Sequence, residues 1–231
     1  MAIYALTGRP RVGKTYYIAS QVPRWLKDKR RVFSNFKLNL GVGALKKFSE
    51  SIVGDIKSEA DRNNPAKLLF YWRNINEWNL MSNGVIICDE GTRYFNPRKW
   101  EQLSEDTEIK LQQHGKEDLD IWVSVQHYSR LDVTLRVLVE RFLDVKRILG
   151  WGNKTFIFRV AELYLEEMER YERLGKEYLE AQNVWTEWHI IWKKYCIIYD
   201  TKASVGRSEP MPLLHITRTC PTCGKQTTKH Y

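Results

Sequence analysis

A glycine-rich loop near the N-terminus carries the clearest chemical signal in the sequence. It reads GRPRVGKT, follows the β-prone run 3–7 and opens the helix-prone run 16–27. Glycines in this setting let consecutive backbone N–H groups point at a phosphate, and the helix start adds partial positive charge. The predicted nucleotide-binding residues are Gly8, Arg9, Pro10, Arg11, Val12, Gly13, Lys14, Thr15 and Tyr16.

Two acids at the end of an apolar run could complete this chemistry. Lys14 would reach the β- and γ-phosphates, and the Thr15 hydroxyl would ligate Mg²⁺. The run 85–88 ends in Asp89 and Glu90. Asp89 is expected to support the same metal ion, and Glu90 to polarise the attacking water as a general base. The sequence therefore predicts ATP and Mg²⁺ as ligands.

A glutamine and several arginines follow a third apolar run. Gln126 ends the run 121–125, where its amide could contact the γ-phosphate or orient water, although a plain strand-end hydrogen bond also fits. Arg130, Arg136 and Arg141 come next. A guanidinium suits transition-state charge, so one of them, with Arg136 as our choice, or a basic residue near His114, could act on a neighbouring subunit's ATP. A salt-bridged helix face is the alternative.

The C-terminal tail carries half of a zinc-ribbon pattern. Cys220 and Cys223 form a Cys-x-x-Cys pair, and His215 and His230 could supply two further Zn²⁺ ligands. A tail without metal, or a site shared between subunits, fits the same residues.

Strand-prone and helix-prone runs alternate along most of the chain. The runs 31–36, 68–72 and 84–88 are β-prone, 45–60 and 160–182 have helical spacing, and 185–199 is typical of a closing strand or hairpin. Such alternation predicts an α/β fold with a mostly parallel sheet between helices. Ligands bind such sheets at the carboxyl ends of the strands, where the loop, the acids and Gln126 all fall.

Composition narrows the class of protein. The 231 residues carry a net charge of +9 and are 43% hydrophobic, which excludes a disordered polyelectrolyte and favours an anionic partner. No apolar run is long enough to span a membrane, no secretory signal is present, and four cysteines fit a reducing compartment. The basic cluster 27–31 could bind DNA or form a solvated helix end.

Several segments together resemble the zonular-occludens-toxin-like ATPases. The matching segments are ALTGRPRVGKTYY, VFSN, IICDE with RYFNPR, QHGK with LDI, QH and LD, and the run 195–201. That family belongs to the HerA/FtsK group of DNA-pumping ATPases; it serves virion assembly and export in filamentous phages, and related proteins package viral genomes. The resemblance implies a RecA-like P-loop NTPase core over 1–202. Composition predicts a linker and a small tail over 203–231, outside the match.

The resemblance also implies roles for particular residues. Lys14 and Thr15 correspond to the Walker A pair, Asp89 and Glu90 to the Walker B pair, and Gln126 to the sensor. Three features depart from the family: Arg9 and Arg11 replace small loop residues, Gly91 replaces a small apolar one, and the membrane segment of the export proteins is missing. The last departure favours soluble packaging or replication-linked translocation over export.

The expected function is an ATP-hydrolysing DNA translocase that forms a homo-oligomeric ring and serves genome packaging or virion assembly. Its expected partners are DNA and capsid or membrane morphogenesis proteins, in the host cytoplasm or associated with the virion. A small-molecule or nucleoside kinase is an alternative, against which the adjacent acids and the lack of a recognisable lid argue. A nucleotide-binding morphogenesis scaffold without significant hydrolysis is the other.

Overall fold

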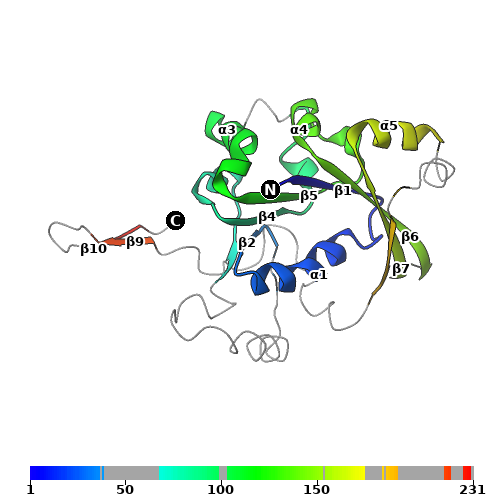
Figure 1. Ribbon diagram of the computed structural model, residues 1–231, viewed down its shortest axis with the longest axis horizontal. Coiled ribbons are helices and arrows are strands. Elements are labelled where there is room, and N and C mark those ends of the chain that lie inside the picture. Colours follow the sequence, from blue (N-terminus) through cyan, green and yellow to red (C-terminus); the bar gives the residue numbers. More distant parts are fainter. Residues whose placement is uncertain are drawn as a thin grey trace.

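The chain folds around an eight-stranded sheet in the computed structural model (Figure 1). The structure describes residues 1–36, 38, 68–98, 103–152, 154–174, 184 and 186–191, and the backbone of 216–219 and 226–229. In spatial order the strands are β3 (Leu69–Tyr71), β2 (Arg31–Ser34), β4 (Gly84–Cys88), β5 (Leu119–Ser124), β1 (Ile3–Thr7), β6 (Arg141–Trp151), β7 (Lys154–Leu163) and β8 (Thr186–Ile190). Neighbouring strands from β3 to β6 are parallel, whereas β7 pairs antiparallel with β6 on one side and with β8 on the other.

The order of the central strands determines which loops meet. β5 lies between β1 and β4, and its register pairs Ser124 with Leu6 on one side and Val123 with Cys88 on the other. The carboxyl ends of the three strands are therefore level. The predicted phosphate loop, the acid pair and Gln126 follow directly after these ends.

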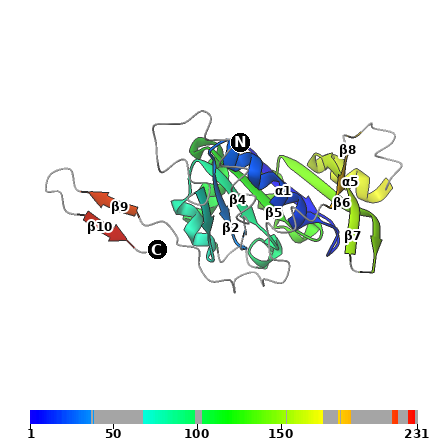
Figure 2. The same ribbon diagram turned by 90° about the horizontal axis from the view of Figure 1, so that it is seen from below.

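Helices cover both faces of the sheet, because its central strands carry apolar side chains on both sides. In β4, Val85 and Ile87 face one hydrophobic cluster, while Ile86 and Cys88 face the other. The helix α1 (Lys14–Lys27) packs into the first cluster. The second cluster includes side chains of α3 (Glu105–Gln113), α4 (Val133–Leu138) and α5 (Leu165–Leu174), which lie on the opposite face from α1 (Figures 1 and 2).

The predicted α/β fold is confirmed, but one expected helix is partly wrong. The structure places Val160–Leu163 at the end of β7, and α5 begins only at Leu165. Val160 and Ala161 are fully buried and pair with both β6 and β8, so sheet pairing overrides the helical spacing. The β6–β7 hairpin was not predicted, although the Gly-Asn pair at 152–153 is a hairpin signal.

The predicted C-terminal segments are described only in part. β8 supplies the expected closing strand, while 192–199 and the expected helix 45–60 lie outside the described residues. The four predicted Zn²⁺ ligands also lie outside them. Within the tail, β9 (Ile216–Thr219) and β10 (Gln226–Lys229) form an antiparallel pair.

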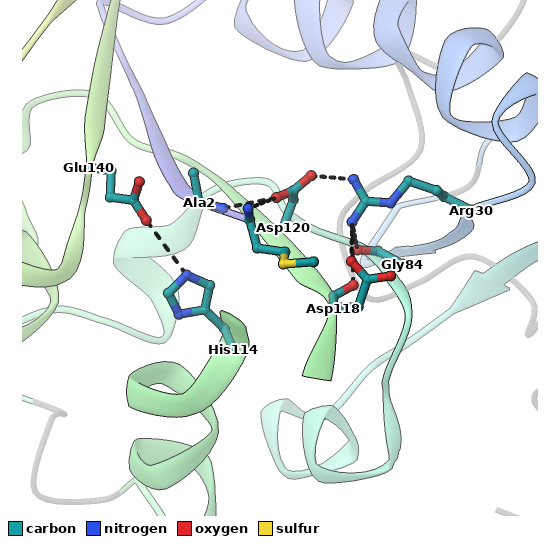
Figure 3. A network of polar contacts seen from close by, with 8 residues as sticks. Ala2, Arg30, Gly84, His114, Asp118, Asp120 and Glu140 are labelled. Carbon is teal, nitrogen blue, oxygen red and sulfur yellow. Dashed lines mark hydrogen bonds and ion pairs between the residues drawn. The ribbon is translucent and has the colours of Figure 1, made fainter. Parts of the chain in front are cut away.

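A polar network ties together the amino ends of the central strands, opposite the loops described above (Figure 3). Asp120 of β5 accepts a hydrogen bond from the Ala2 backbone N–H at 2.9 Å and forms an ion pair with Arg30. Arg30 also donates to the Gly84 carbonyl at 2.9 Å. Arg30 of the basic cluster 27–31 therefore stabilises the sheet.

Each helix in the described part of the chain is too short or too polar to span a bilayer.

Candidate nucleotide-binding site

The loop between β1 and α1 adopts a conformation that depends on its two glycines. Gly8 and Gly13 have φ values of 140° and 116°, a region that side chains rarely adopt. A Cβ on Gly8 would lie 2.3 Å from the Val145 carbonyl oxygen, and one on Gly13 would lie 2.9 Å from the Phe158 ring. The Thr155 hydroxyl donates to the Arg11 carbonyl at 2.7 Å. The β6–β7 hairpin therefore supports the loop from outside.

Lys14 lies across this loop. Its Nζ donates to the Gly8 carbonyl at 2.7 Å and to the Arg9 carbonyl at 3.0 Å. Burial lowers the pKa of Lys14, and the nearby carboxylates of Asp89 and Glu90 partly oppose that shift. An anion bound in the loop would provide a negative charge next to this buried ammonium and so stabilise its charged form.

Thr15 and Asp89 meet although 74 positions separate them in the sequence. The Thr15 hydroxyl donates to Asp89 Oδ2 at 2.9 Å. Asn35, which follows β2, accepts from the Asp89 backbone N–H and donates to the Asp89 carbonyl, both at 2.8 Å. The Ser124 hydroxyl donates to Asp89 Oδ1. One hydroxyl and one oriented carboxylate are hard oxygen donors, so the residues fit Mg²⁺ held together with phosphate oxygens.

Glu90 is exposed beside Asp89. Its backbone N–H donates to the Ser124 hydroxyl at 3.1 Å, and its φ of 54° is uncommon for a residue other than glycine. Gly91 follows because nothing larger fits: a Cβ there would lie 2.2 Å from Val123 Cγ1.

Gln126 and the three arginines that follow it in the sequence make contacts with different parts of the structure. The Gly8 backbone N–H donates to the Gln126 carbonyl at 3.3 Å, so Gln126 does adjoin the loop. Its side-chain Oε1 accepts from Arg130 at 3.0 Å. Arg136 instead lies over the Tyr128 ring, and Arg141 forms an ion pair with Glu162 at 3.3 Å. Of the three arginines, Arg130 is thus the one bonded to a predicted site residue.

A cavity of about 890 Å³ opens beside the loop, toward β6 and α5. Residues 8–12 and Gln126 form part of its wall. On the other side, Asp144 accepts from the Tyr171 hydroxyl at 2.9 Å and from the Thr7 hydroxyl at 3.2 Å. Burial, and then the Asp144 carboxylate, raise the pKa of the Tyr171 phenol. Volumes of this order are typical of small-molecule sites.

Sequence reasoning missed several contributors to this site. Asn35 and Ser124 carry a usable signal, since both are polar residues at the ends of β-prone runs. Asp144 and Tyr171 carry none, because their meeting depends on the β6–β7 hairpin. Among the described residues, no group of three or more His, Cys, Asp and Glu side chains could hold a metal ion.

Comparisons with known proteins agree with this architecture. The model of the family described as "Zonular occludens toxin (Zot)" matches residues 2–183. The "Gene 1 protein" of Escherichia phage If1 is 27% identical over 154 residues, which are 64% of this chain and 42% of that protein. The chain thus spans less than half the length of this relative.

Two solved structures are also similar. The N-terminal domain of zonular occludens toxin from Neisseria meningitidis has a TM-score of 0.53 at 20% identity, covering 87% of this chain and 99% of that one. The genome packaging NTPase B204 from Sulfolobus turreted icosahedral virus 2 has a TM-score of 0.43 at 14% identity, covering 72% and 94%. The first similarity confirms the fold. Because the family model matches most of its length, the chain belongs to the zonular occludens toxin (Zot) family.

Proposed function

We propose that this protein binds ATP with Mg²⁺ and hydrolyses it. The single observation that carries the proposal is the 2.9 Å hydrogen bond from the Thr15 hydroxyl to Asp89, with Glu90 next in the chain. This bond joins the end of a phosphate-loop motif to an acid pair on a separate strand. Both groups lie at the carboxyl edge of a parallel sheet, where such folds bind ligands.

The nucleotide would occupy two adjoining spaces. Its phosphates would bind the backbone N–H groups of the loop, and Lys14 would exchange the Gly8 and Arg9 carbonyls for phosphate oxygens. The nucleoside would enter the 890 Å³ cavity beside the loop. A phosphate bound in the loop would also offset the unfavourable burial of the Lys14 charge.

Hydrolysis would require a base and a means to detect the terminal phosphate. Glu90 is exposed next to Asp89, so its carboxylate can accept a proton from a water molecule aligned with the γ-phosphate. Mg²⁺, when bound, would neutralise charge on the phosphate oxygens. The Gln126 side chain would contact the γ-phosphate, since its backbone adjoins Gly8 of the loop.

The larger role that we propose is DNA translocation by a homo-oligomeric ring, in viral genome packaging or virion assembly. Membership of the Zot family and a net charge of +9 support it. Partners would be DNA and capsid or membrane morphogenesis proteins. We propose residues 1–202 as the ATPase domain and 203–231 as a separate tail, with Arg136 as the residue acting on a neighbour's ATP.

The test is an ATPase assay across protein concentration, without DNA and with single- or double-stranded DNA. Replacing Glu90 by Gln should preserve nucleotide binding and lower kcat by at least about 100-fold, because it removes the base. Glu166→Gln, on α5, is the matched control. Undiminished hydrolysis in E90Q would refute the role of Glu90.

The alternatives give different results in the same assay. A scaffold would bind nucleotide but stay at background hydrolysis with DNA and at high protein concentration. A kinase would transfer the phosphate to a small molecule and would show no stimulation by DNA.

A further inference from the structure

A second, cationic cavity lies beside the segment that follows the acid pair. Its volume is about 600 Å³, and its walls are Thr92, Asn96, Pro97, Arg98 and Arg130. Two of these five side chains are arginines, and none is a carboxylate. Neither Arg98 nor Arg130 takes part in the ion pairs between described residues. The cavity therefore presents two positive charges that no carboxylate of the described chain balances.

Local hydrogen bonds build one wall of this cavity. The Asn96 side chain donates to the Thr92 carbonyl at 2.9 Å and accepts from the Arg98 backbone N–H at 3.0 Å. Asn96 thereby ties Arg98 to the turn η3 (Gly91–Arg93), which begins one residue after Glu90. The Asn96 side chain thus holds the backbone of Arg98 to the segment that follows the acid pair, while the Arg98 side chain is exposed.

Arg130 connects this cavity to the nucleotide site. It ends the turn η6 (Tyr128–Arg130), and its Nη1 donates to Gln126 Oε1 at 3.0 Å. Gln126 also lines the 890 Å³ cavity beside the phosphate loop. Arg130 therefore lines the cationic cavity, and its guanidinium holds the amide that we assign to the γ-phosphate.

We propose that the cationic cavity binds the phosphodiester backbone of DNA, and that this binding draws Arg130 away from Gln126. A guanidinium prefers a phosphate to a neutral amide, because the phosphate carries a full negative charge and can accept two parallel N–H bonds from the planar guanidinium. Gln126 is then free to contact the γ-phosphate or the attacking water. The proposal rests on the proposed ATPase function and adds the site through which DNA would stimulate it.

The first experiment measures DNA affinity. Arg98→Gln should weaken binding of labelled single- or double-stranded oligonucleotides about 5- to 30-fold, and should reduce the slope of log affinity against log salt by about 1. Arg173→Gln, a loss of one positive charge on α5, is the matched control and should show neither effect. Thermal unfolding checks that each variant is folded.

Competition with inorganic phosphate distinguishes the two possible ligands of this cavity, a DNA backbone and a free phosphate ion. If the cavity takes a DNA backbone, millimolar phosphate should compete only weakly, because one phosphate lacks the neighbouring contacts of a chain. Unchanged oligonucleotide affinity in both R98Q and R130Q would overturn the proposal. The proposal would also be overturned if these variants lost binding of inorganic phosphate without any loss of oligonucleotide affinity.

The second experiment measures coupling. If Arg130 restrains Gln126, Arg130→Gln should raise the DNA-free ATPase rate toward the DNA-stimulated rate of the unmodified protein and abolish further stimulation. A merely structural role would lower both rates, and that result would overturn the coupling. Failure of the unmodified protein to hydrolyse ATP, with or without DNA, would instead overturn the proposed function, and the affinity measurements would still decide whether DNA binds the cavity.

Discussion

Asp89, which follows β4, is held in one orientation by its protein neighbours before any nucleotide binds. Asn35 holds its backbone through two hydrogen bonds of 2.8 Å, and Ser124 and Thr15 each donate to one of its carboxylate oxygens. Three elements thus converge on one residue. Such support fixes the direction of the carboxylate, which a metal-assisted reaction requires.

Lys14 shows the opposite condition, a group whose placement is unfavourable without its ligand. Burial lowers its pKa, so its charged form costs folding free energy in the free protein. We expect Lys14→Met to lower affinity for a fluorescent ATP analogue about 10- to 100-fold, through loss of charge-assisted bonds. The same variant should unfold at an equal or higher temperature than the unmodified protein when nucleotide is absent.

Lys27→Met provides the control, since Lys27 is exposed at the end of the same helix. It should change neither the analogue affinity nor the stability appreciably. A marked loss of stability in K14M would contradict the argument that the buried charge is costly.

At the scale of elements, the sequence predicted the core strands because their signals are local. The runs that became β1, β2, β3, β4 and β5 are short, apolar and bounded by polar residues, and the parallel topology brings their ends together. The loop, Asp89, Glu90 and Gln126 could therefore be placed at one edge from sequence alone.

The β6–β7 hairpin could not be predicted in the same way. Its buried residues alternate with charged ones such as Arg159 and Glu162, and the apolar stripe that continues into α5 resembles a single long helix. Pairing with β6 and β8, which is not local, decides the structure. The cavity wall at Asp144 and Tyr171 was missed for that reason. Arg141, for which a salt-bridged helix face was the alternative, lies in β6 and pairs with Glu162.

Gly91 tests how closely β5 must approach the turn after the acid pair. Gly91→Ala should lower the free energy of unfolding by about 1–3 kcal/mol, because the new Cβ would overlap Val123 Cγ1 at 2.2 Å. Urea denaturation measures the change. Gly115→Ala is the matched control, since nothing lies within 4 Å of its Cβ position.

A second substitution identifies the clash as the cause. Val123→Ala removes the methyl groups that a Cβ at Gly91 would meet, so G91A should cost less in the V123A background than in the unmodified protein. Equal costs in both backgrounds would show that the close approach is not what requires glycine.

For the whole molecule, the buried phenols determine how stability responds to high pH. Burial raises the pKa of Tyr17 and of Tyr171, with Glu187 adding to the first shift and Asp144 to the second. In the unfolded chain both phenols ionise near pH 10. The folded state therefore holds more protons above that pH, and the stability present below pH 10 is lost as the pH rises.

The expected loss is at most about 1.4 kcal/mol per pH unit for each phenol above pH 10. Urea unfolding between pH 8 and pH 11 measures it, with the buried thiol of Cys88, whose pKa is also raised by burial, beginning its own loss at a lower pH. Tyr17→Phe removes one ionising group from the unfolded chain, so its stability should fall less steeply above pH 10. Tyr164→Phe changes an exposed ring and should leave the slope unaltered. If Y17F and Y164F show equal slopes, the packing of Tyr17 against Trp122 and Phe158 does not keep its phenol protonated.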